Sequence, residues 1–364
     1  MFCAGPRPLI KNPSPLQRIA WQYPNNRTMM KILKAGFLFG ALLPLLTACG
    51  QSAAWKGKIT YEHSSDINEY DLASKKDRML FQQATQPSLA APGEIVFLNA
   101  AFPKRNLLVR KRTAAGQNRD VLDMSSDNPD YKAALEAYSV IRGTGISGIL
   151  SSMSDPSISP DGRFLALTIH GYKGQGFERN CVAIFDIASR KLLHKFEGKY
   201  YGRWMPDGRL LMSGWHKAES VDGPVYKEAQ PGIFITDAAL GGVRRIDRDL
   251  DDPAPYHATP SPDGRQVAFI LNGHLWVMKI DGSDARQLTD VDRDNVETYP
   301  AWSPDGKYIA CWTYKTFEKS YYTAIAIVPA AAKAPVVLSD KAAVWPRDPK
   351  GYRISGGSHQ MSWK

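Results

Sequence analysis

The sequence predicts an all-β protein, a six-bladed β-propeller of four-stranded antiparallel blades with one short helical insertion. Two observations carry this prediction. A turn motif flanked by β-branched and aromatic residues recurs at blade-sized intervals, and the two ends of the repeat array complement each other. The repeat gives the strand order within a blade, and the ends indicate how the ring closes.

The recurring motif is Ser-Pro-Asp-Gly, which begins at Ser159, Ser261 and Ser303, and a variant begins at Met205. Proline presets φ at the second turn position, and glycine adopts the positive φ that closes a hairpin. The prolines of these four copies are 46, 56 and 42 residues apart. A strand-forming repeat of about 40 to 50 residues is typical of a propeller blade. A degenerate copy, residues 91–94, marks one further blade.

The ends of the array indicate how the ring closes. Residues 57–61 have the pattern of a second strand with no first strand before it, followed by two more strands. Residues 358–364 have the pattern of a first strand with nothing after it. We therefore expect the C-terminal strand to complete the first blade, because closure removes the exposed edges of an open array. Six blades follow.

These repeats resemble the TolB-like (WD40-like) propeller repeat, with its aromatic, Ser-Pro-Asp-Gly, Ile-Ala-Phe and Val-Met-Asp elements, most fully over residues 261–290. The resemblance covers residues 57–364, clearly in four repeats and weakly in the first two. It implies the propeller fold. The partners of TolB are not carried over, because TolB has an additional N-terminal domain for which this chain has no room.

The beginning of the chain resembles a bacterial lipoprotein precursor. Residues 1–29 contain no acidic residue, and we interpret them as untranslated or disordered. From Met30, two lysines precede a short apolar segment, and Leu46-Thr47-Ala48-Cys49 resembles a lipobox. We expect residues 30–48 to be a signal peptide, Cys49 to carry diacylglycerol and a fatty acid, and residues 49–56 to be a linker. The alternative is an ordinary signal peptide with a chance cysteine.

The residue after Cys49 and the charge of the chain bear on location and partner. Lipoproteins kept in the inner membrane usually carry aspartate after the cysteine, so Gly50 implies by resemblance an outer-membrane anchor, facing the periplasm. Six basic residues and no acidic one precede Cys49, so the formal charge falls from +10 to +4 without the leader. A balance this mild argues against a nucleic-acid partner.

Two further cysteines, Cys181 and Cys311, lie in strand patterns three repeats apart. A closed ring places them nearly opposite each other, too far apart for a disulfide. We expect both to be buried thiols that fill core space.

Topology divides the connections between two ends of the ring. With the strands of a blade called a to d from inside to outside, the a–b and c–d turns share one end, called the turn end. The b–c loops and the connections between blades share the other, called the loop end. Stretches 170–180, 215–230 and 314–322 are predicted to be long b–c loops with aromatics among lysines. We predict that Trp215, Tyr226, Phe317 and Tyr321 bind an envelope protein or a glycan; the alternative is that they only cover blade ends.

The largest insertion, residues 124–153, joins the second and third blades at the loop end. Asn128-Pro129, followed by Tyr131, Leu135 and Tyr138 at helical spacing, predicts a short helix over the mouth of the ring.

Evidence for a metal or an active site is weak in the sequence. Asp290, Asp292 and Asp294 resemble the first half of a calcium loop, but Asn295 replaces the required glycine, and solvated loop acids are the alternative. No other cofactor and no catalytic residue is assigned. His257 and His359 lie near the starts of inner strands and could face the central channel.

The sequence therefore favours a non-enzymatic outer-membrane lipoprotein whose propeller is a binding platform. The alternative is a periplasmic polysaccharide lyase or glycosidase with a site at the channel mouth. Convergence of His257 and His359 with an acidic connector residue and a basic side chain would favour the enzyme.

Substitution Cys49→Ser tests the lipid anchor. We expect the variant to remain unprocessed or to become soluble, because the acyl chains that hold a lipoprotein on the membrane can no longer be attached. Membrane fractionation and mass of the mature protein measure this. A variant that stays with the membranes at wild-type size would contradict the lipobox interpretation.

Overall fold

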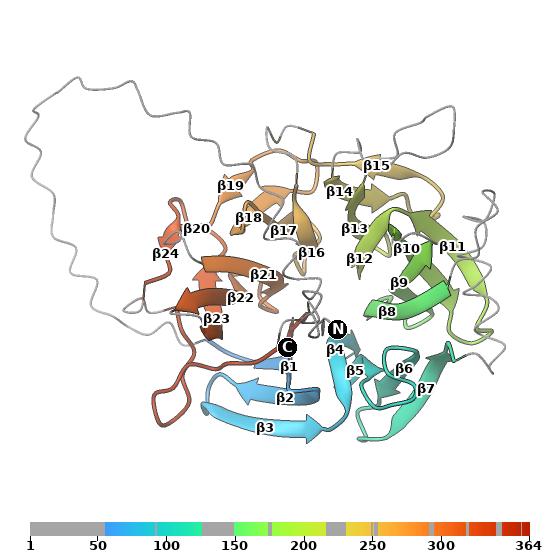
Figure 1. Ribbon diagram of the computed structural model, residues 1–364. Coiled ribbons are helices and arrows are strands. Elements are labelled where there is room, and N and C mark those ends of the chain that lie inside the picture. The colour runs from blue at the N-terminus through green and yellow to red at the C-terminus, as the bar shows by residue number, and fades with distance from the viewer. Residues whose placement is uncertain are drawn as a thin grey trace, which may run out of the picture. The chain divides into compact units, whose positions relative to one another are not determined.

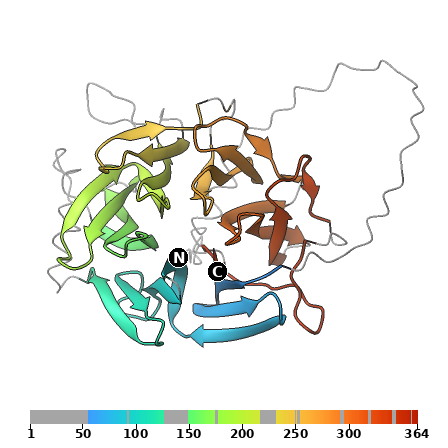
Figure 2. The same ribbon diagram turned by 180° about the vertical axis from the view of Figure 1, so that it is seen from behind.

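The protein was analysed as a computed structural model, which describes residues 55–91, 93–125, 149–173, 177–215, 231–248, 250, 254–290, 295–317, 320–339, 344–357 and 359–364. The described chain from residue 55 onward forms a ring of six blades around one axis (Figures 1 and 2). This confirms the predicted all-β propeller of antiparallel blades. The described residues contain strands and no helix. Accordingly, no helix among them is long and apolar enough to cross a membrane.

Five blades contain four strands each, and their inner strands lie nearest the axis. The first blade consists of β25 (Ser362–Trp363), β1 (Lys58–His63), β2 (Asp66–Asp71) and β3 (Lys76–Phe81). The second consists of β4 (Ala84–Ala91), β5 (Glu94–Asn99), β6 (Leu108–Arg112) and β7 (Asn118–Asp123). The third consists of β8 (Ile149–Ile158), β9 (Phe164–Lys173), β10 (Phe177–Asp186) and β11 (Leu192–Glu197).

The fourth blade consists of β12 (Lys199–Trp204), β13 (Leu210–Trp215), β14 (Pro231–Thr236) and β15 (Val243–Arg245). The fifth consists of β16 (Tyr256–Pro260), β17 (Gln266–Leu271), β18 (His274–Lys279) and β19 (Arg286–Gln287). The sixth contains β21 (Asn295–Trp302), β22 (Tyr308–Phe317) and β23 (Ser320–Pro329).

The Ser-Pro-Asp-Gly motif forms the turn from the inner strand to the next one. In the third blade the Ser159 hydroxyl donates to Asp161 over 2.5 Å and accepts from the Phe164 amide. Gly162 adopts φ +76°, and its amide donates to the Ser159 carbonyl over 2.8 Å. The copies at Ser261 and Ser303 make the same hydroxyl-to-aspartate bond. The motif thus satisfies its own polar groups, which explains why it recurs as a unit.

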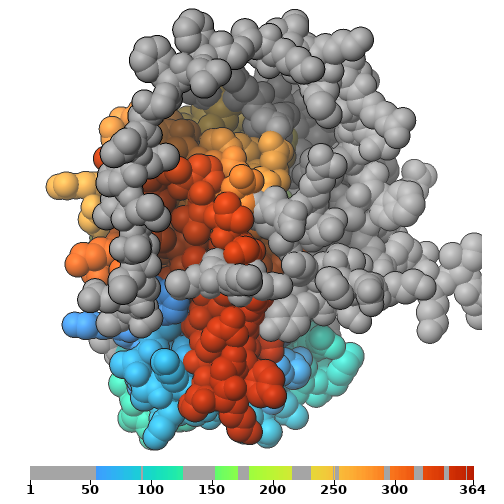
Figure 3. Space-filling view, turned by 90° about the vertical axis from the view of Figure 1, so that its left-hand side faces the viewer, coloured from blue at the N-terminus to red at the C-terminus, as the bar shows by residue number. Residues whose placement is uncertain are grey.

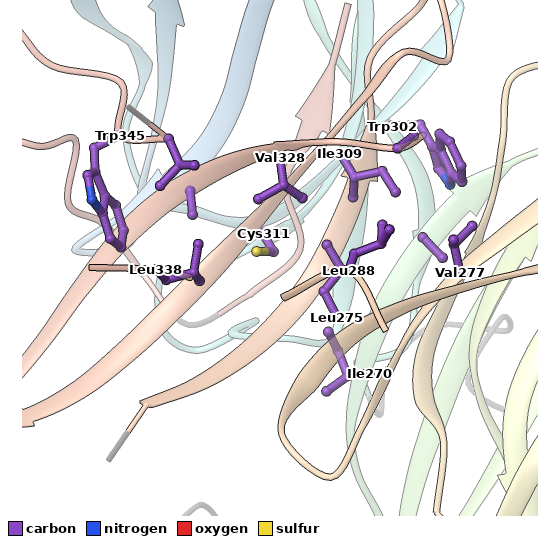
Figure 4. Packing of buried hydrophobic residues seen from close by; sticks show 14 of the residues in the cluster. Ile270, Leu275, Val277, Leu288, Trp302, Ile309, Cys311, Val328, Leu338 and Trp345 are labelled. Atoms are coloured by element: carbon purple, nitrogen blue, oxygen red, sulfur yellow. The ribbon is translucent and has the colours of Figure 1, made fainter. Parts of the chain in front are cut away.

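Apolar clusters between neighbouring blades form the core. The cluster between the fifth and sixth blades contains Leu275, Leu288 and Cys311 (Figure 4). At its inner edge, Trp302 donates its indole N–H to the Thr259 carbonyl of the fifth blade over 3.2 Å. Each blade therefore buries one apolar face against the next, so no blade has a complete core by itself.

The ring closes as the sequence predicts. β25 pairs with β1 through Ile59 opposite Trp363. Beyond this ladder, the Lys58 and Lys364 amides each donate to the carbonyl of the other residue, over 2.6 and 2.9 Å. The Trp363 indole is buried and donates to the Lys56 carbonyl over 2.9 Å.

The outer edge of the sixth blade differs in detail from the regular repeat. The short strand β24 (Val336–Val337) pairs in parallel with β20 (Thr289–Asp290), which follows the fifth blade. Residues 344–357 cover β23 instead, through bonds from the Ile325 and Ile327 amides. The same segment accepts a hydrogen bond from Tyr70 of the first blade, beside which it lies in Figure 3.

Of two sequence expectations about single features, one is confirmed and the other stays untested. Cys181 and Cys311 are free and buried, as predicted. The helix predicted at residues 128–138 lies outside the described residues.

Deleting residues 358–364 tests the closure. We expect the free energy of unfolding to fall by more than the roughly 3 to 5 kcal/mol that a buried tryptophan-to-alanine change costs, because an inner strand is lost with its indole. Chemical denaturation measures this, with Trp363→Ala as the smaller lesion for comparison. Wild-type stability in the truncated protein would contradict closure by β25.

Candidate functional site

The inner strands share one backbone irregularity close to the axis. In β4, β8, β12, β16 and β21 the pairing with the next strand shifts register, as at a β-bulge. The shift coincides with one non-glycine residue of positive φ, between 51° and 56°, in each strand: Gln86, Asp155, Tyr201, His257 and Tyr299. Gln360 stands at the same register position before β25. We call these six residues the axial ring.

Contacts across the axial ring join blades that are not neighbours. Tyr201 of the fourth blade and Tyr299 of the sixth have ring centroids 5.7 Å apart, with His257 of the fifth stacked on Tyr299 at 3.8 Å. Gln360 of the first blade donates to the Gln86 carbonyl over 2.8 Å and lies 3.5 Å from the Pro156 carbonyl of the third. Such contacts are possible only at the axis, so these side chains fill the centre of the ring.

Arg203 supplies a buried positive charge beside the axial ring. Its guanidinium lies over the Tyr201 ring, 3.9 Å from the centroid, and donates to the Asp155 carbonyl over 3.3 Å. Strand register places Ser88, Ser157, Thr259, Ala301 and Ser362 at the equivalent position of the other blades. One blade therefore provides a long cation where the other five provide a small side chain.

A second polar pair lies beside the ring on the first blade. Nδ1 of His359 lies 2.8 Å from the Glu62 carboxylate, which also accepts the Thr85 hydroxyl and, over 3.2 Å, the Gln86 amide. Burial alone would lower the pKa of His359, but the Glu62 carboxylate raises it above the ordinary value. Burial alone would raise the pKa of Glu62, but His359 and Thr85 lower it. Both directions favour the ionised pair.

A chain of hydrogen bonds leads from the third blade to the axial ring. The Ser154 hydroxyl lies 2.7 Å from Nε2 of His170 and 2.6 Å from the Asp155 carboxylate. Nδ1 of His170 lies 2.9 Å from the Asn180 side-chain oxygen. This looks like a nucleophile with its base and orienting amide. However, Ser154 has a single proton and two acceptors within reach, so the Asp155 carboxylate competes with His170 for it.

His257 sits in the least polar part of the ring. Burial lowers its pKa to about 3, and the charges of Arg203 and His359 act in the same direction while Asp155 opposes them. His257 and His359 therefore do converge near two acids and one arginine, as the enzyme hypothesis requires. The acids are Asp155 and Glu62, which lie on strands, and not residues of the acidic connectors. At neutral pH His257 is neutral and held between aromatic rings.

None of the predicted partner residues belongs to the axial ring, and some lie outside the described residues. Trp215 ends β13, and Phe317 and Tyr321 lie on β22 and β23, where Thr316 is opposite Tyr321. Tyr226 and Cys49 lie outside the described residues. The structure does not test these assignments, which stay predictions.

Two of the expected long loops are in fact extended hairpins. β9 and β10 continue to Lys173 and Phe177, and β22 and β23 continue to Phe317 and Ser320. Each of these strands has 10 residues, against six in β17 and β18. Aromatic residues among lysines formed strands here because alternation with a paired partner suffices for a strand. The two hairpins belong to the third and sixth blades, on opposite sides of the ring (Figure 1).

The calcium prediction is mostly beyond the described chain. Asp290 is exposed at the end of β20, while Asp292 and Asp294 lie outside the described residues. Within the residues that the structure describes, no group of three His, Cys, Asp or Glu side chains is placed to hold a metal ion.

Most of the axial ring was missed at the sequence level. Gln86, Asp155, Tyr201, Tyr299 and Gln360 share no chemistry, so no composition pattern marks them. A positional signal did exist: Asp155, Tyr201, His257 and Tyr299 each precede the proline of their turn motif by five residues.

Comparison with known proteins supports the fold. No protein-family model matches the sequence, and no curated protein matches it significantly. TolB from Acinetobacter baumannii matches with a TM-score of 0.51 and 14% identity, over 84% of this chain and 66% of that one. This chain thus spans slightly less than two thirds of that TolB.

Two other solved structures match less closely. A protein described as a TolB from Agrobacterium tumefaciens has a TM-score of 0.48 and 15% identity, over 85% of this chain and 98% of that one. An oligogalacturonate lyase from Vibrio parahaemolyticus has a TM-score of 0.42 and 10% identity, over 79% and 78%. The structural match to the Acinetobacter baumannii TolB supports a TolB-like six-bladed propeller fold. The low sequence identities leave the activity open.

Substitution His257→Asn tests the burial of the axial ring. The folded pKa of about 3 lies below that of the unfolded chain, so neutral His257 contributes stability that is present above about pH 6.5 and is lost as the pH falls toward 3. Each pH unit in that window costs at most about 1.4 kcal/mol. Asparagine tolerates positive φ and does not titrate.

We therefore expect acidification from about pH 7 to about pH 5 to destabilise the variant less than the wild type. Urea denaturation at both pH values measures the difference, with His194→Gln on β11 as the control. The same loss on acidification in the wild type and in His257→Asn would contradict a neutral His257 in the folded protein.

Proposed function

We propose that this chain is a non-enzymatic outer-membrane lipoprotein, anchored through Cys49 and facing the periplasm, whose propeller is a binding platform. The partner is an envelope protein or a glycan. The proposal combines the lipobox resemblance of residues 46–49 with a TolB-like propeller fold. The fold by itself does not name a function.

The contacts that the polar groups near the axis make with one another are the reason for proposing a platform and not an enzyme. General acid–base catalysis needs a side chain that exchanges protons near the working pH and reaches the substrate. His257 has a pKa of about 3 and is stacked on Tyr299. The Ser154 hydroxyl lies between His170 and the Asp155 carboxylate, which competes with the histidine for its proton. His257 is therefore held neutral, and the carboxylates of Asp155 and Glu62 already accept hydrogen bonds from protein groups.

The loop end offers a scaffold for partner binding. The extended hairpins of the third and sixth blades add four residues per strand to the six of a regular strand. At about 3.3 Å per residue, four residues extend a strand by roughly 13 Å beyond a six-residue strand. Phe317 and Tyr321 are carried by one of these hairpins, on paired backbone. Rigid presentation of aromatic residues lowers the entropy cost of binding.

A carbohydrate-active enzyme with a site at the channel mouth is the second candidate, and one observation favours it. The His359 side chain keeps 36% of its surface exposed while it pairs with Glu62. An ionised histidine beside a carboxylate can orient a sugar hydroxyl. Loss of glycan turnover in His359→Gln, with folding unchanged, would identify this activity.

Alanine substitution of Trp215, Tyr226, Phe317 and Tyr321 together tests the platform. We expect partner recovery from crosslinked envelopes to be abolished, because aromatic side chains dominate many interfaces, while the melting temperature stays close to the wild type. The matched control is Arg190→Glu, in the turn between β10 and β11 at the turn end, which should leave recovery intact. Loss of the partner in Arg190→Glu and not in the alanine variant would place the binding face at the turn end.

A further inference from the structure

A cavity of about 300 Å³ lies between the first and second blades at the turn end. It is lined by β2 and β3 of the first blade, by turns of the second blade at Gly93 and Gly116, and by Lys364 after β25. This end lies opposite the proposed partner face. The cavity therefore concerns a function separate from the proposed platform.

A single buried carboxylate holds three cations on one side of the cavity. Glu69 is 3% exposed and accepts from Lys58 over 3.2 Å, from Arg78 over 2.7 Å and from Lys364 over 2.8 Å. Burial alone would raise the pKa of Glu69, but these three hydrogen bonds lower it to about 2. The carboxylate is thus ionised at neutral pH, and it is shared among three cations, of which Lys58 also lies 4.0 Å from the Asp71 carboxylate.

Arg112 provides a further cation on the second-blade side. Its guanidinium donates to the Asn118 side-chain oxygen over 3.2 Å and lies over the Phe81 ring, 5.0 Å from the centroid. Within the described residues, no ion pair involves Arg112. The lining therefore contains three cationic side chains, Arg78, Arg112 and Lys364, against the one carboxylate of Glu69. The side chains of the lining therefore carry an excess of two positive charges. A negatively charged main-chain carboxylate on Lys364 would reduce this excess to one positive charge.

Two turn glycines keep the space beside these cations open. Gly93 and Gly116 adopt φ of +78° and +82°, which disfavours most other residues. A Cβ at Gly116 would lie 3.4 Å from Nη2 of Arg112. A larger side chain at Gly116 would therefore occupy the room in front of this guanidinium.

The rest of the lining contains Thr113 and several apolar side chains. Leu80 and Ile95 line the cavity, and Met79 beside them is 52% exposed. A ligand that pairs with the guanidinium groups can therefore also bury a short hydrocarbon part.

We propose that this cavity binds a small molecule that carries a phosphate or carboxylate group and a short apolar part. Arg112 and Arg78 bind the anionic group, because a planar guanidinium matches carboxylate and phosphate oxygens. Lys364 adds charge, and Leu80, Ile95 and Met79 contact the apolar part. The volume suits a ligand of a few carbon atoms rather than a polymer.

Calorimetric titration of the full-length protein at low salt tests the proposal, with n-butyl phosphate, butyrate and n-butanol as probes. We expect one or both anions to bind and n-butanol not to bind. Arg112→Gln should weaken anion binding about tenfold or more, because a charged hydrogen bond is lost. Gly116→Asn should weaken it as well by filling the space, since asparagine tolerates positive φ. The tighter of the two anions identifies the anionic group.

Arg265→Gln is the matched control, because it removes one exposed arginine from a different turn at the same end of the ring. It should leave the affinity within about twofold, apart from weak long-range screening effects. The proposal is overturned if neither anion binds at about 5 mM, if n-butanol binds as well as n-butyl phosphate, or if Arg265→Gln weakens binding as much as Arg112→Gln. Melting temperatures separate loss of binding from loss of folding, and Gly116→Asn provides the test if Arg112→Gln is unstable.

Discussion

The structure depends on one constraint: six inner strands must meet around a single axis and fill the space between them. The axial ring meets this constraint through a bulge in each of five strands, which turns one side chain inward. A non-glycine residue of positive φ costs about 1 to 2 kcal/mol, so the surrounding contacts must hold it in place. The stacking of His257 on Tyr299 and the bond from Gln360 to Gln86 are such contacts. The inter-blade cores depend on the same closure, because each uses the next blade as its other half.

The hydrogen bonds between polar side chains at the axis favour one order of the blades around the ring over other orders. An apolar plug would pack in many ways, whereas several polar groups here have specific partners, although Nη2 of Arg203 and Oε1 of Gln360 have none among the described residues. The Asp155 amide needs the Gln86 side chain, and the Asp155 carboxylate needs Ser154 and Thr168. An unpaired buried polar group costs about 1 to 3 kcal/mol, so a ring with one blade misplaced would lose several such terms at once. We infer that the axial ring specifies the order of the blades more than it adds to their stability.

Local signals explain what the sequence could predict. Ser303-Pro304-Asp305-Gly306 satisfies its own hydrogen bonds, so it can be recognised without its surroundings, and the missing and spare strands define closure by counting. The axial ring depends on backbone position and not on residue type, so Gln86 and Tyr299 cannot be recognised as equivalents from their chemistry. The extended hairpins were taken for loops because Tyr172 lies between Gly171 and Lys173 and because Phe317 lies in a segment with several charged residues. The charged cavity joins Glu69 and Arg112 of consecutive blades with Lys364, which is far from them in sequence and reaches them only when β25 closes the ring.

The two ends of the axis differ in what they can do chemically. At the loop end, the ionised pair of His359 and Glu62 is the accessible part of a network whose other members are committed to each other. His257 is poorly suited to exchange protons in an acid–base reaction, because stacking and a pKa of about 3 keep it neutral. Opening the ring to free His257 would expose the bulges and break contacts between non-adjacent blades. Binding at the hairpins requires no such change, because they extend beyond the axial ring and leave it intact. The closed axis therefore favours recognition over catalysis for the same reason that it holds the blades together.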